Sequence, residues 1–161
     1  MTSKQKTRLA IVRCDTHAYW FGIFMDHVDP LILATYSDEA PTRESVHHYF
    51  KVLASPGQMR IKPVPGFVIS KVFDRIMEQG EDNNGSPKLQ HGTYPGRAIA
   101  FSKTFLSHPK GCDTKEETAE GVDAAYIADS SSPRDGADHL ELARPFLERG
   151  IPTFVDKPFA A

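Results

Sequence analysis

The sequence predicts an α/β fold, a three-layer sandwich in which a mostly parallel sheet lies between two layers of helices. Short apolar runs alternate with helical patterns along the chain, as they do in proteins built from strand, crossover helix and strand. The first run, Leu9 to Val12, is apolar without alternation, which is typical of a central strand covered on both faces. The chain has 161 residues, room for one domain, so we assign residues 1–161 to one domain.

A helix is expected directly after this first strand. Asp15 or Thr16 is the expected N-cap, because short polar side chains there can accept a hydrogen bond from a free backbone N–H group of the first turn. Apolar side chains then recur at helical spacing and predict one buried stripe. The stripe consists of Trp20, Ile23, Phe24, His27 and Val28.

An insertion of about residues 30–66 is expected between this helix and the next main strand. Within it Leu31 to Tyr36 is strand-like, and Pro and Gly residues mark a loop before Gly66. Phe67 to Phe73 is β-branched and aromatic, which predicts the next strand of the sheet. That strand ends at Asp74.

The second half of the chain continues the alternation of helices and strands. A helix is expected around Ala98 to Phe105, and Thr114 to Glu117 has the pattern of a capping box. Val122 to Ala128 and Thr153 to Val155 predict two more strands. Pro145 interrupts the helical pattern between them. It is expected to kink that helix, or to lie where the carbonyl that it leaves without a donor finds another partner.

Composition and charge exclude several classes of partner. The chain has 19 Lys and Arg against 21 Asp and Glu, a formal charge of -2, so no broad cationic face is available for a nucleic-acid backbone. No apolar run approaches the roughly 18 residues that span a bilayer, and none near the N-terminus resembles an export signal. The 2 cysteines, Cys14 and Cys112, are too few for a disulfide framework and are expected as thiols. We expect a soluble cytoplasmic protein without nucleic-acid or membrane partners.

Three segments in the final third of the chain form a recognisable pattern, namely Val122 to Asp129, His139 to Ala143 and Gly150 to Pro158. Together they resemble the nucleotide-binding domain of the glucose-fructose oxidoreductase and inositol dehydrogenase (Gfo/Idh/MocA) family. The family's closing motif is usually Glu-Lys-Pro, and here Asp156, Lys157 and Pro158 keep the carboxylate, lysine and proline in order. The similarity covers roughly residues 8–161.

The resemblance implies a Rossmann-like domain that binds NAD or NADP. In this family such a domain is part of oxidoreductases that act on sugars, polyols and related alcohols. The resemblance therefore implies a small-molecule cofactor and a small-molecule substrate as partners. In the family a C-terminal domain supplies much of the substrate site, and the printed sequence lacks a counterpart of it. The resemblance is also compatible with a homo-oligomer.

Sheet topology, independently of the family, also predicts a ligand site at the carboxyl ends of the strands. In open parallel sheets ligands bind beyond the carboxyl ends of the strands, and polar residues gather at those expected ends. The cofactor-binding candidates at the strand ends are Asp15, Thr16, His17, Asp74, Arg75, Ala128, Asp129, Ser130, Asp156 and Pro158.

Two residues receive further roles from the resemblance. Lys157 matches the family's catalytic lysine, whose ammonium group can orient a substrate hydroxyl, stabilise developing oxyanion charge or donate a proton. Pro158 disfavours helical geometry at Lys157 and so keeps that residue extended. His139 matches a position on the substrate side of the family site.

Asp74 is the candidate that bears on the choice between NAD and NADP. A carboxylate at the end of the second strand can accept hydrogen bonds from both adenosine ribose hydroxyls, and it repels a 2′-phosphate. This slightly favours NAD, although Arg75 next to it acts in the opposite direction. Asp38, which follows the strand-like Leu31 to Tyr36, is the alternative acid for this role.

The first turn departs from the pattern of a dinucleotide-binding loop. Such a loop normally carries glycines that let the backbone approach the diphosphate, but Arg13 to Phe21 contains none and Gly22 comes too late. Asp15 would also bring negative charge to the diphosphate. The alternative is therefore a non-catalytic binding or scaffold protein that keeps the fold without the cofactor. No metal site is expected, because the histidines lack metal-ligand spacing.

Overall fold

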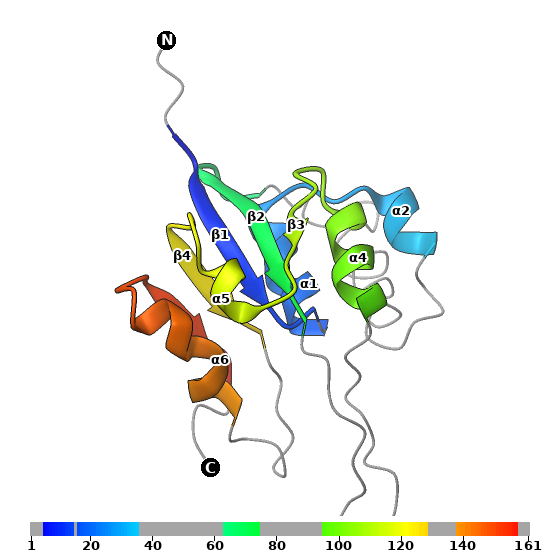
Figure 1. The fold of residues 1–161 in the computed structure, drawn as a ribbon. Helices are drawn as coiled ribbons and strands as arrows, with labels where there is room; N and C mark the ends of the chain where they lie inside the picture. Colours follow the sequence, from blue (N-terminus) through cyan, green and yellow to red (C-terminus); the bar gives the residue numbers. More distant parts are fainter. Residues whose placement is uncertain (1–4, 15, 36–62, 75–94, 129–137, 158–161) are drawn as a thin grey trace, which may run out of the picture.

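A five-stranded, all-parallel sheet forms the centre of the protein. The structure is a computed structural model, and it describes residues 5–14, 16–35, 63–74, 95–128 and 138–157. The strands lie in the order β3-β2-β1-β4-β5, so β1 is central (Figure 1). Their bounds are β1 Thr7–Val12, β2 Phe67–Phe73, β3 Lys110–Gly111, β4 Ala124–Ile127 and β5 Thr153–Val155.

Helices cover both faces of this sheet and make a three-layer sandwich. One layer holds α1 (Thr16–Met25), α2 (Pro30–Thr35) and α4 (Pro95–Thr104); the other holds α5 (Lys115–Thr118) and α6 (Asp138–Leu147). In Figure 1 α1 lies behind the sheet, and α5 and α6 lie in front of it. Alternate side chains of β1 enter opposite cores, with Ile11 packed on the first layer and Ala10 and Val12 on the second. The predicted Rossmann-like α/β fold is confirmed.

The buried face of α1 differs from the predicted stripe. Ala18, Tyr19 and Ile23 are buried against the sheet and α4, whereas Phe24 and His27 are exposed. Apolar side chains lie on nearly all sides of this helix, so periodicity alone does not select the inward face. Gly22 decides the orientation, because its missing side chain lets α1 approach the ring of Phe105 closely.

Replacing Gly22 with alanine is expected to destabilise the protein. A Cβ atom at Gly22 would lie 2.8 Å from Phe105 Cζ, and that ring is fully buried and packed on Phe101 at a centroid distance of 4.4 Å. The ring has little room to move, so overpacking of about 1–3 kcal/mol should exceed the gain in helix propensity of roughly 1 kcal/mol. Urea unfolding of Gly22→Ala measures the balance, with Ser102→Ala on the half-buried side of α4 as the control. Equal or greater stability of Gly22→Ala would show that α1 and the ring of Phe105 can move apart at no cost in free energy.

The segment predicted as strand-like, Leu31 to Tyr36, is helical as far as Thr35, so this prediction was wrong. Asp29 caps α2, because its Oδ1 accepts hydrogen bonds from the backbone N–H groups of Leu31 at 2.9 Å and Ile32 at 3.1 Å. Pro30 is the first helical residue, where a missing N–H group costs nothing. This local capping outweighs the strand propensity of the apolar residues. Most of the expected insertion, including Asp38, lies outside the described residues.

The helices of the second layer follow the predicted pattern. Thr114 caps α5, and its side chain accepts a hydrogen bond from Glu117 N at 3.1 Å. Pro145 lies inside α6, and the carbonyl of Glu141, one turn earlier, accepts a hydrogen bond from Lys115 Nζ at 3.0 Å. The carbonyl that Pro145 leaves without a donor is thus satisfied by a side chain from α5.

An ion pair between the starts of β1 and β4 ties these strands together at the amino edge of the sheet. Arg8 donates to Asp123 through its backbone N–H at 2.8 Å and through Nε and Nη2 at 3.0 and 2.9 Å. These hydrogen bonds, with the guanidinium charge, lower the pKa of Asp123 to about 2.

Within the described residues, no helix is long and apolar enough to cross a membrane.

Candidate functional site

The carboxyl edge of the sheet contains a point where the strand order reverses. From β1 the chain builds β2 and β3 on one side, then returns to place β4 and β5 on the other. In doubly wound α/β proteins ligands bind at such a switch point, outside the carboxyl ends of the strands. The candidate site therefore lies above the ends of β1 and β4.

On the β2 side of the switch point, Arg13 and Asp74 form a buried ion pair. Asp74 follows β2, as predicted, and Arg13 follows β1 and donates its backbone N–H to Phe73 O at 2.7 Å. Arg13 Nη1 lies 3.5 Å from Asp74 Oδ1, and the two side chains are 7% and 2% exposed. The carboxylate predicted to meet a ribose is therefore engaged by an arginine of the same chain.

Arg13 also has the backbone conformation that a glycine would favour. Its φ is 74°, in the left-handed region that ordinary residues adopt only at a cost. It is the first residue after the central strand, where the turn of a dinucleotide-binding loop begins. The turn thus keeps the left-handed backbone without the glycine. Sequence analysis missed Arg13, although a charged residue directly after a buried apolar strand was a visible signal.

On the β4 and β5 side, His17, Tyr126 and Asp156 form a second group, which we call the His17 cluster. Asp156 follows β5, and its Oδ2 pairs with His17 Nδ1 and accepts a hydrogen bond from the Tyr126 hydroxyl at 3.2 Å. Its Oδ1 accepts the backbone N–H of Lys157 at 2.8 Å. The carboxylate thus joins the first turn of α1, strand β4 and the backbone of Lys157.

The members of the His17 cluster are largely shielded from water. Tyr126 and Asp156 are buried, and the His17 side chain is 15% exposed. The imidazole lies against the indole of Trp20, with ring centroids 5.3 Å apart. Sequence analysis identified His17 and Asp156 but not Tyr126. The available signal was the alternation of side chains along β4, which directs Tyr126 toward the α1 layer.

The other predicted site residues have varied surroundings. Lys157 is exposed beside Asp156, and Ala128 is buried at the end of β4, where its N–H donates to Val12 O at 2.9 Å. Thr16 begins α1 at the carboxyl end of β1, and His139 is buried in the first turn of α6. The remaining candidates, which lie outside the described residues, are Asp15, Arg75, Asp129, Ser130 and Pro158.

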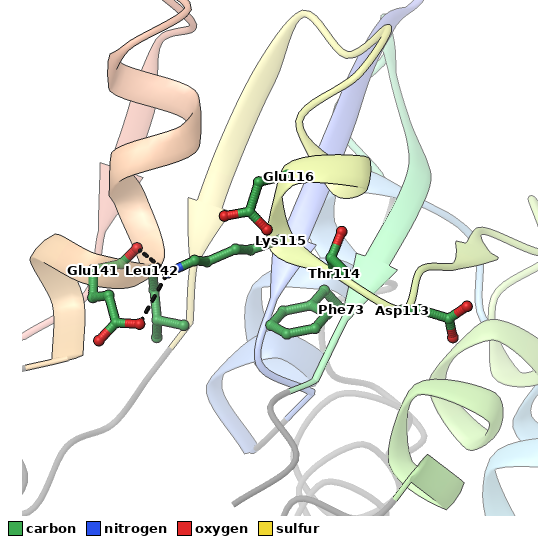
Figure 2. A pocket seen from close by; sticks show the side chains of 7 residues that line it. All are labelled: Phe73, Asp113, Thr114, Lys115, Glu116, Glu141 and Leu142. Carbon is green, nitrogen blue, oxygen red and sulfur yellow. Dashed lines mark hydrogen bonds and ion pairs between the residues drawn. The ribbon is translucent and has the colours of Figure 1, made fainter.

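A cavity of about 200 Å³ lies beside the ends of β2 and β3, on the α5 and α6 side. The residues that line it are Phe73, Asp113, Thr114, Lys115, Glu116, Glu141 and Leu142. Figure 2 shows Lys115 reaching from α5 to α6, where its Nζ bonds Glu141 Oε1 at 3.0 Å. Phe73 and Leu142 supply apolar walls, and the carboxylates outnumber the single lysine. Sequence analysis did not identify this cavity.

Thiol and metal chemistry find little support among the residues that the structure describes. Cys14 and Cys112 are both buried and form no disulfide among the described residues, in line with the expected thiols. Burial raises the pKa of the Cys112 thiol, so this thiol is a poor nucleophile near neutral pH. Within the described ranges no group of three or more His, Cys, Asp and Glu side chains could hold a metal ion.

Comparison with known proteins adds no relative. No protein-family model matches the chain, and no curated protein or solved structure matches it either. The geometry of the carboxyl edge therefore carries the functional argument.

Proposed function

We propose that this chain is the dinucleotide-binding domain of an NAD(P)-dependent oxidoreductase that acts on sugars, polyols or related alcohols. The observation that carries the proposal is the reversal of strand order at β1 and β4, with ionisable side chains at the strand ends on both sides of it. A dinucleotide consists of two mononucleotide halves, and a doubly wound sheet offers one seat on each side of the reversal.

The cavity beside β2 supports a seat for the adenosine half. Its volume of about 200 Å³ and its apolar side chains, Phe73 and Leu142, suit a neutral aromatic base. Asp113, Glu116 and Glu141 also line it, while the charge of Lys115 is compensated by Glu141. A 2′-phosphate would meet net negative charge here. This favours NAD over NADP, for a different reason than the predicted contact of Asp74 with the ribose.

The turn after β1 fits a dinucleotide less well than the two sides of the switch point do. Arg13 fills the position of the first glycine and engages Asp74, so neither offers the usual backbone approach or a ribose acceptor. The first turn of α1 begins at the carboxyl end of β1, and the dipole of this helix favours an anion there. The diphosphate would therefore depend on α1 rather than on a glycine loop.

Lys157 is the residue that we assign to the substrate. The bond from its backbone N–H to Asp156 Oδ1 fixes the chain directly after β5, and its side chain is exposed at the carboxyl edge. An ammonium group there can donate hydrogen bonds to a substrate hydroxyl and stabilise the negative charge that develops on its oxygen. A bound nicotinamide would supply the hydride acceptor or donor.

A second candidate function is a binding or scaffold protein that keeps the fold and does not bind the cofactor. The Arg13–Asp74 pair favours this alternative, because both side chains are buried and engaged with each other at the turn where a dinucleotide would cross β1. Under this alternative the charges at the strand ends serve stability alone.

Titration with NADH and NADPH distinguishes the two functions. Trp20 is the single tryptophan of the chain and lies in α1, next to His17. Binding at the carboxyl edge should quench its fluorescence and give energy transfer to the reduced nicotinamide in a saturable way, with NADH binding more tightly than NADPH. Trp20→Phe, which should remove the signal, is the control. A flat response to both cofactors at millimolar concentration would support the scaffold alternative.

A further inference from the structure

The bonding pattern of the His17 cluster is the arrangement that orients a histidine for proton transfer. Asp156 meets the imidazole at Nδ1, which leaves Nε2 as the ring nitrogen that faces away from the carboxylate. A carboxylate in this position holds the imidazole in one orientation and favours the tautomer with the proton on Nδ1. Nε2 is then the basic nitrogen of the ring.

Both oxygens of Asp156 are engaged within the chain. It is buried, and its two oxygens already meet His17, the Tyr126 hydroxyl and the Lys157 N–H group. We therefore regard Asp156 and Tyr126 as positioning residues.

Lys157 has a different role in the proposed function, because an ammonium group offers three donors that can orient a hydroxyl and stabilise an oxyanion. Removal of hydride from an alcohol also releases the hydroxyl proton, and some group must accept that proton. Among the described residues around Asp156, the imidazole of His17 is suited to this task.

We propose that His17 is a catalytic residue whose Nε2 accepts the hydroxyl proton of an alcohol substrate, with Asp156 and Tyr126 as positioning residues. The inference rests on the proposed function. In the step the substrate C–H and O–H bonds break and a C=O bond forms. A bound oxidised nicotinamide would accept the hydride, and the proton would pass to His17 and then to water. His17, Asp156 and Lys157 would thus share one alcohol site at the β4 and β5 half of the edge.

Side-chain NMR of the ¹⁵N-labelled chain tests the orientation of the imidazole. Long-range ¹H–¹⁵N spectra report which ring nitrogen carries the proton. We expect the Nδ1–H form for wild-type His17 and for Tyr126→Phe, which keeps the carboxylate, and a shift toward the Nε2–H form in Asp156→Asn. An Nε2–H form in the wild-type chain would overturn the proposal.

Cofactor and activity measurements then separate this inference from the proposed function. Saturation with NAD⁺ should move the His17 ring resonances and leave those of His27, exposed beyond the far end of α1, in place. In the complete native gene product, His17→Gln should lower alcohol oxidation about 100-fold or more without loss of NADH affinity, and His27→Gln should not. NADH binding with unmoved His17 resonances, or with full activity of His17→Gln, overturns the role of His17 alone. Absence of NADH binding overturns both proposals.

Discussion

Replacing Arg13 with alanine is expected to lower the free energy of unfolding by about 3 kcal/mol, because it leaves the Asp74 carboxylate buried without its cation. The two side chains are 7% and 2% exposed, so water cannot replace the lost guanidinium. Urea unfolding followed by tryptophan fluorescence measures the effect. A midpoint equal to that of the wild type would show that the ion pair contributes nothing.

Two further variants separate the charge from the backbone conformation. Arg13 has a φ of 74°, which costs roughly 1 kcal/mol or more for any residue with a Cβ atom. Arg13→Gly removes the same guanidinium but relieves this strain, so it should be more stable than Arg13→Ala by about 1 kcal/mol. The double variant Arg13→Ala with Asp74→Ala removes both charges and should recover much of the loss. If the double variant were as unstable as Arg13→Ala, packing rather than charge would explain the effect.

Replacing Lys157 with alanine is expected to reduce turnover about 100-fold or more in the complete native gene product, while NADH affinity stays unchanged. The ammonium group acts on charge that develops at the substrate oxygen, so its loss raises the barrier rather than weakening cofactor binding. NADH formation with myo-inositol, D-glucose and xylitol as probes measures turnover, and Trp20 fluorescence measures affinity.

The matched control for this variant is Lys103→Ala. Lys103 is also exposed, but it lies in the last turn of α4, away from β5. It should retain both turnover and affinity. Wild-type turnover in Lys157→Ala would remove Lys157 from the mechanism, and a parallel loss of NADH affinity would assign it to cofactor binding instead.

Both predictions concern the same edge of the sheet, but they address different halves of it. The Arg13–Asp74 pair lies at the carboxyl ends of the adjacent strands β1 and β2, whereas Lys157 and the His17 cluster lie at the ends of β4 and β5. The two proposed functions differ mainly in the role that they give to the Arg13–Asp74 pair. Strong NADH binding together with a stabilising ion pair would mean that α1 holds the diphosphate without help from a glycine loop.

Much of the fold follows from local patterns that are visible in the sequence. Apolar runs predicted β1, β2, β4 and β5, and the capping box at Thr114 predicted the start of α5. One of the two expectations for Pro145 was that the carbonyl it leaves without a donor finds another partner, and in the structure that partner is Lys115. The helix α2 was missed because the cap formed by Asp29 outweighs the strand propensity of the residues that follow it.

The sequence by itself determined the alternation of strands and helices, and with it the placement of Asp74 and Asp156 directly after strands. Only the tertiary structure decided which side chains these carboxylates meet. Asp156 contacts His17, which is 139 residues away along the chain, and Tyr126, which is 30 residues away. Local propensities depend on neighbours within a few residues, whereas these contacts depend on strand order and on how closely α1 packs at Gly22. The residues of the candidate site were therefore visible one by one, and their pairing required the packed sheet.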